Sequence, residues 1–168
     1  GSGATADWAA ISSGSIGTYS GYTLITGTMG AADYSAQNWK VNNAAGALTA
    51  SATVNSLVLT TDFSISSGAT MTLGSGGLIL SGISRWLKNN GNGDTVGTGQ
   101  LTSGMGSGEL FVDVPSATSD ANNWRIWPKI VDNGGTPVIL VKNGPGYIRL
   151  EAANSYTGGT ILNSGTVF

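Results

Sequence analysis

The chain has no cysteine and no histidine among its 168 residues. Without cysteine it can form neither a disulfide framework nor a thiolate metal site. Without histidine it lacks the side chain that most often serves as a general base and that most often binds transition metals. Both absences argue against an enzyme, and we expect the chain to need no cofactor.

Charged side chains are also scarce. The chain carries seven basic and nine acidic residues, for a net charge of −2. A protein that binds nucleic acid through electrostatics needs a basic surface, and so does a module that lies on an anionic membrane. No apolar run is long enough to cross a bilayer. We therefore expect neither a nucleic acid nor a membrane as partner.

Glycine is abundant, with 27 residues, and 40% of the chain is hydrophobic. The apolar residues recur in short segments separated by glycine, serine and asparagine, which are turn formers. Residues 54–80 contain four such segments, and residues 137–168 contain four more. Short strands at this spacing predict a coiled β-solenoid with three strands in each rung of roughly 20 residues.

The chain length fits one domain. Residues 1–3 are expected to be a cloning remnant, residues 4–50 an irregular N-terminal cap with the first rungs, and residues 51–168 regular rungs. Residues 124–131 are expected to form one strand. Because the sequence stops within an apolar segment at Phe168, we expect it to be a fragment of a larger secreted protein.

A spaced set of residues near the C-terminus resembles a known repeat. The matching residues are Leu140, Val141, Lys142, Gly144, Gly146, Asn154, Tyr156, Gly158, Gly159, Thr160, Asn163, Gly165 and Thr166. Through them residues 131–168 resemble the autotransporter-associated β-strand repeat, and residues 54–114 resemble it more loosely. The resemblance implies an all-β fold, a single-stranded right-handed parallel β-helix.

Two groups of polar residues resemble parts of known kinds of site. The Asn89–Asp94 loop resembles half of a calcium loop, but it lacks the bidentate acid that closes such loops, so a plain turn is favoured and no metal is expected. Among the carboxylates only Glu109 and Asp113 share a strand face, at a separation of about 13 Å along the strand. Paired glycosidase carboxylates lie within about 9.5 Å of each other. We therefore expect no catalytic residues.

Aromatic residues provide the candidate binding site. Alternation along the predicted strands places the side chains of Trp86, Phe111, Trp127 and Tyr147 outward, with Lys88, Arg125 and Lys129 as basic neighbours. Rungs spaced ~4.8 Å apart would let such rings stack on consecutive sugars of an extended glycan. The alternative is that these rings shield corners of the coil, and it is favoured for Phe111 and Tyr147. Trp8, Trp39 and Trp124 are expected to be buried.

Two functions fit these features. The first is a non-catalytic carbohydrate-binding module for plant cell-wall polysaccharide, most simply xylan, linked in cis to a catalytic domain. Its size, expected fold and tryptophan content are similar to those of the β-helical carbohydrate-binding module family 89. The second is a shaft or adhesin segment of an autotransporter-like bacterial surface protein. Both imply a secreted or cell-surface location, and solvent-exposed tryptophan distinguishes the first from the second.

Overall fold

The computed structural model describes residues 7–42, 46–82, 85–89, 98–116 and 123–168, and these contain strands and no helix. The strands are β1 (Ala9–Ser12), β2 (Ser15–Thr18), β3 (Thr23–Leu24), β4 (Thr28–Met29), β5 (Asp33–Val41), β6 (Gly46–Leu48), β7 (Ala52–Leu59), β8 (Phe63–Ile65), β9 (Thr70–Leu80), β10 (Arg85–Asn89), β11 (Gln100–Ser103), β12 (Glu109–Asp113), β13 (Trp124–Ile126), β14 (Lys129–Ile130), β15 (Ile139–Asn143), β16 (Tyr147–Leu150), β17 (Thr160–Leu162) and β18 (Thr166–Val167). The prediction of an all-β protein is confirmed.

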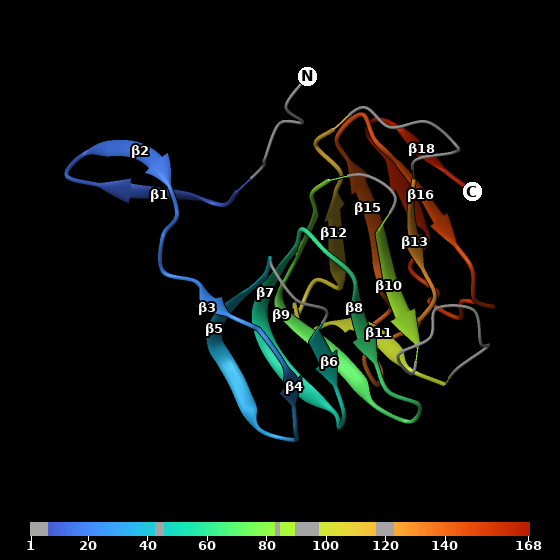
Figure 1. Ribbon diagram of the computed structural model, residues 1–168. Coiled ribbons are helices and arrows are strands. Elements are labelled where there is room, and N and C mark those ends of the chain that lie inside the picture. Colours follow the sequence, from blue (N-terminus) through green and yellow to red (C-terminus); the bar gives the residue numbers. More distant parts are fainter. Residues whose placement is uncertain (1–6, 43–45, 83–84, 90–97, 117–122) are drawn as a thin grey trace.

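The strands stack in parallel along three faces (Figure 1). One face is a nine-stranded sheet in the order β3-β5-β7-β9-β12-β15-β17, with β11 and β14 attached through β9. A second face is a seven-stranded sheet in the order β4-β6-β8-β10-β13-β16-β18. Strands β11 and β14 form the third face together with the first parts of β5, β7 and β9. Within these sheets every pairing between the named strands is parallel.

The register shows that the chain returns to the same lateral position after each set of strands. Leu57 lies beside Leu78, Leu78 beside Val112, Val112 beside Lys142, and Lys142 beside Leu162. These steps take 21, 34, 30 and 20 residues, so the first and last match the predicted rung length and the two middle steps are longer. This repetition is consistent with a β-solenoid.

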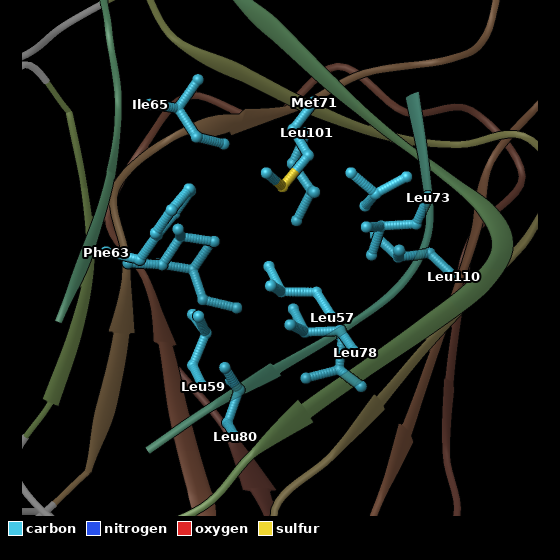
Figure 2. Packing of buried hydrophobic residues seen from close by; sticks show 14 of the residues in the cluster. Leu57, Leu59, Phe63, Ile65, Met71, Leu73, Leu78, Leu80, Leu101 and Leu110 are labelled. Atoms are coloured by element: carbon cyan, nitrogen blue, oxygen red, sulfur yellow. The ribbon is translucent and has the colours of Figure 1, made fainter. Parts of the chain in front are cut away.

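Alternation within the strands builds the core. Residues 52–54, 70–73 and 86–89 alternate between buried and partly exposed positions, so leucine, valine, isoleucine and methionine of successive rungs stack inside the coil. Figure 2 shows this stacking for Leu57, Leu59, Leu78 and Leu80 and for Phe63 and Ile65. Each buried side chain of this kind contributes roughly 1.5–3 kcal/mol. Trp39 and Trp124 are fully buried, as predicted.

The N-terminal residues form an arm beside the stack. Strands β1 and β2 make an antiparallel hairpin, with Ile11 opposite Ile16, that stands clear of the sheets (Figure 1). Parallel pairing begins at β3, where Thr23 lies beside Trp39. Residues 7–22, called the N-terminal arm below, return to the stack only at their base, where Asp7 forms an ion pair with Lys40.

The segment 124–131 differs from the single strand that was expected. It consists of β13 and β14, separated by Trp127 and Pro128. Proline fixes its own φ and has no N–H to donate to the ladder, so it favours a corner over a continuing strand. The corner carries the chain from the seven-stranded sheet to the face formed by β11 and β14.

Candidate functional site

Three of the predicted glycan-binding residues lie on the outer surface of the seven-stranded sheet, and Trp127 lies at the corner that follows β13. Trp86 of β10 is in register with Arg125 of β13, and Lys88 lies two residues beyond Trp86 on the same side of the strand. The backbone N–H of Trp127 donates to the carbonyl of Leu87 at 3.0 Å, which places Trp127 next to β10. We call Trp86, Lys88, Arg125 and Trp127 the sheet surface cluster.

Both tryptophans of this cluster are only partly exposed. The Nζ of Lys88 lies 5.4 Å from the centre of the Trp86 ring, and the guanidinium carbon of Arg125 lies 5.8 Å from it. Cations at these distances are attracted to the ring face. A sugar that stacked on Trp86 would therefore compete with two cations for the same ring.

Carboxylates balance the basic members of the sheet surface cluster. Lys88 pairs with Asp62 at 2.8 Å, and Arg125 pairs with Glu151 at 3.5 Å. The second oxygen of Asp62 accepts the backbone N–H of Trp86 at 3.0 Å. Partly exposed ion pairs of this kind contribute little to stability, about 0–1 kcal/mol. They hold the cluster in place and leave it without a strong positive field.

The other three predicted residues lie outside this cluster. Lys129 belongs to β14 and is in register with Gln100, so the corner at Pro128 has turned it onto a different face from Trp127. Phe111 lies on the outer side of β12, in the nine-stranded sheet. Tyr147 begins β16 in the seven-stranded sheet, with its ring centre 5.9 Å from that of Phe168. The seven predicted residues therefore do not form one platform.

A cleft that sequence patterns did not predict lies between the base of the N-terminal arm and the nine-stranded sheet. It encloses about 340 Å³ and is lined by Trp8, Ala9, Tyr19, Asn38, Asn55, Ser56, Ser75, Gly77 and Phe111. Trp8 is only partly buried, which differs from the expectation of a buried ring. Strand alternation predicts that Phe111 points outward. No local sequence pattern predicts that Trp8 and Tyr19 of the arm lie against the rung that contains Gly77.

Several contacts hold the arm at this cleft. The backbone N–H of Trp8 donates to the Tyr22 hydroxyl at 3.0 Å, and the N–H of Tyr19 donates to the carbonyl of Trp8 at 2.8 Å. The Asp7 carboxylate pairs with Lys40 at 2.7 Å. Burial, together with a hydrogen bond to Asp7, raises the pKa of Tyr22, so its hydroxyl stays protonated at neutral pH. The base of the arm is therefore fixed to β5.

A lysine lies inside the coil near its C-terminal end. The side chain of Lys142 in β15 is fully buried and is in register with the buried Val112 of the preceding rung. Its ammonium donates to the carbonyls of Asn143, of Gly144 at 2.8 Å and of Ser164 at 3.3 Å. Burial lowers the pKa of Lys142 to about 8, and the Asp113 carboxylate acts in the opposite direction. One amine thus joins the turns of two successive rungs.

The turns around Lys142 require glycine. Gly144 and Gly165 have φ angles of +73° and +78°, a region that other residues rarely adopt. A Cβ at Gly165 would also lie 2.6 Å from the carbonyl oxygen of Gly144 and 2.9 Å from the Lys142 amine. Close packing of two turns around one amine explains why lysine and glycine occur together here.

Residues 140–167 match the passenger-associated-transport-repeat. This family match supports the predicted resemblance to an autotransporter-associated repeat, and it includes Lys142 and both glycines. It covers one rung and part of the next, and it says nothing about the family 89 resemblance. No curated protein and no solved structure matches the chain.

Among the described residues no cluster of three acidic, histidine or cysteine side chains could hold a metal ion. Residues 90–94 of the Asn89–Asp94 loop, where a plain turn was expected, lie outside the described residues. In the same described ranges there is no helix that could cross a membrane.

Proposed function

We propose that this chain is a segment of the passenger of an autotransporter-like secreted or surface protein, where it forms part of a right-handed β-helical shaft. The observation that carries the proposal is the passenger-associated-transport-repeat at residues 140–167, located on stacked parallel rungs. The right-handed sense follows from the strong preference of crossovers between parallel strands for that hand. A cysteine-free chain also forms no disulfide that would lock it before export.

The repeat suits an extended shaft for a physical reason. A solenoid rung contacts only its neighbours, so its stability depends on the surfaces that it shares with them. Lys142 contributes to this shared surface, because its amine binds carbonyls of its own turn and of the turn one rung later. A shaft built in this way grows by repetition and needs no catalytic residues.

Carbohydrate binding is the second candidate function, and the sheet surface cluster favours it. Two partly exposed tryptophans and two basic side chains on or beside one sheet surface offer ring faces together with hydrogen-bond donors. Two features weigh against it, since Lys88 and Arg125 already lie over Trp86, and since Lys129 and Phe111 are on other faces. The xylan specificity and the linked catalytic domain stay predictions.

The passenger proposal predicts where the protein is found. Antibodies against this chain are expected to label intact cells that make the protein, or to detect it in their medium. Mild protease treatment of intact cells should remove the cell-bound signal. A cytosolic protein followed in the same samples serves as the control and should stay intact. Labelling that appears only after the cells are lysed would contradict the proposal.

A further inference from the structure

The cleft beneath the N-terminal arm has the composition of a binding site. Three aromatic side chains line it, those of Trp8 and Tyr19 from the arm and that of Phe111 from β12. The rest of its lining consists of amides, hydroxyls and small residues, and none of the described lining residues is charged. Its volume of about 340 Å³ is at the small end of the range typical of small-molecule clefts, ~300–1,000 Å³.

We propose that this cleft binds a neutral saccharide. Its pyranose ring lies against the aromatic side chains of Trp8 and Phe111, and its hydroxyls meet the side chains of Asn55 and Ser75. An aromatic ring offers a large stiff surface for the apolar C–H face of a sugar. Amides and hydroxyls both donate and accept hydrogen bonds, as the hydroxyls of a sugar do. Saccharide binding would be a function additional to that of the shaft, which needs no ligand.

The lack of charge in the cleft defines the class of ligand. A nucleotide or a uronic acid would bring a negative charge that no lining residue neutralises, and burying an unpaired charge is costly. The ammonium of Lys40 at the base of the arm is already paired with the Asp7 carboxylate at 2.7 Å. A neutral ligand with many hydroxyls is therefore the best match.

A hydrogen-bond network fixes the polar wall of the cleft. The amide nitrogen of Asn38 donates to the Tyr19 hydroxyl at 2.9 Å, which joins the arm to β5. The amide oxygen of Asn38 accepts from the Asn55 amide at 2.7 Å and from the Ser56 hydroxyl at 2.6 Å. These bonds orient the Asn55 amide and leave its carbonyl oxygen as an acceptor for a ligand. The wall is formed before a ligand arrives.

Gly77 makes the aromatic wall possible. Its backbone lies under the Trp8 ring, and a Cβ at this position would lie 2.8 Å from the Cη2 and 2.9 Å from the Cζ2 of that ring. Phe111 is in register with Gly77 one rung later, so the two rings lie over neighbouring rungs. The indole Nε1 of Trp8 is buried and has no hydrogen-bond partner among the described residues.

Affinity electrophoresis of the whole chain tests the proposal. The probes are a soluble β-glucan and a neutral xylan, with polygalacturonate as the charged control. At least one neutral glycan should retard the wild type, whereas polygalacturonate should not. Trp8→Ala and Phe111→Ala should each weaken binding by about 10- to 100-fold, as expected for loss of a central aromatic contact. Gly77→Ala should weaken it too, since the new methyl group displaces Trp8 without deleting a ring.

Trp86→Ala is the matched control, because it removes an aromatic ring from the sheet surface cluster and leaves the cleft intact. Thermal melts of all variants should show that the rungs remain folded. The proposal is overturned if neither neutral glycan retards the wild type, or if polygalacturonate alone does. It is also overturned if Trp86→Ala abolishes binding while Trp8→Ala, Phe111→Ala and Gly77→Ala leave it unchanged. Failure of this test leaves the surface location of the protein, and hence the passenger proposal, unaffected.

Discussion

Replacing Lys142 with methionine is expected to lower the free energy of unfolding by about 3 kcal/mol. Methionine fills much of the same volume but cannot donate hydrogen bonds. The carbonyls of Asn143, Gly144 and Ser164 then lose their shared donor inside the coil. Lys129→Met is the matched control, because Lys129 lies on an outer face, and it should change the stability by no more than about 0.5 kcal/mol. Urea denaturation of both variants measures the difference, and equal stability would contradict the role assigned to Lys142.

The pH dependence of the wild type's free energy of unfolding tests the role of Lys142 in a second way. The pKa of Lys142 falls from its ordinary 10.5 to about 8 in the folded protein. Between these values the unfolded chain binds more protons than the folded chain, so the free energy of unfolding rises as the pH rises. The rise should be about 2 kcal/mol between about pH 7 and about pH 9.5. Lys142→Met should lack it, and an identical rise in that variant would assign the titration to another group.

Gly144→Ala is expected to cost about 3–5 kcal/mol. The φ of +73° alone makes an alanine unfavourable by about 1–2 kcal/mol. The added Cβ would also collide with the carbonyl oxygen of Val114 and lie 2.6 Å from a carboxylate oxygen of Asp113. The carbonyl oxygen of Val114 belongs to the backbone of the preceding rung. The collision can therefore be removed only if the two rungs move apart.

Gly134→Ala separates the two contributions to this cost. Gly134 also has a positive φ, of +60°, but a Cβ there would meet nothing within 4 Å. This variant should therefore lose only the ~1–2 kcal/mol of backbone strain. Thermal or urea unfolding of Gly144→Ala and Gly134→Ala measures the loss in the free energy of unfolding for each. Equal losses at the two positions would show that the rungs are not packed as closely as the structure has them.

Local patterns in the sequence predicted much of the fold. Glycine-rich corners between short apolar segments indicated the coil, and alternation placed Trp86 and Phe111 outward and Trp124 inward. The same alternation, started from the buried Leu140, places Lys142 inward. A charged side chain is rarely buried unless it is paired, so alternation alone does not predict a buried lysine at this position. The carbonyl groups that pair with it come together only in the folded structure.

The site was less predictable for two physical reasons. A single corner at Pro128 changes the face on which later residues lie, so alternation counted through residues 124–131 gave Lys129 the wrong neighbours. The aromatic cleft depends on contacts between residues distant in sequence, such as Trp8 with Gly77 and Tyr19 with Asn38. No periodicity within a strand encodes the place where an arm returns to a sheet. Residues that line such clefts therefore require the folded structure.

The most direct test of the parallel coil is a pair of engineered cysteines. Thr53 and Thr72 are register partners on adjacent rungs, and both are partly exposed. Neighbouring strands lie about 4.8 Å apart, within the Cα separation that a disulfide spans. Thr53→Cys with Thr72→Cys should therefore form an intramolecular disulfide on mild oxidation, without background because the chain has no other cysteine.

The control is the double variant Asp33→Cys with Thr72→Cys. Asp33 is the register partner of Thr53 one rung earlier, so it lies two rungs from Thr72. That distance of about 10 Å is too long for a disulfide. Mass spectrometry of the oxidised, alkylated monomer distinguishes linked from free thiols in both double variants. The parallel coil predicts a linked Thr53–Thr72 pair and free thiols in the Asp33–Thr72 pair. Free thiols in the first variant, or linkage in the second, would contradict it.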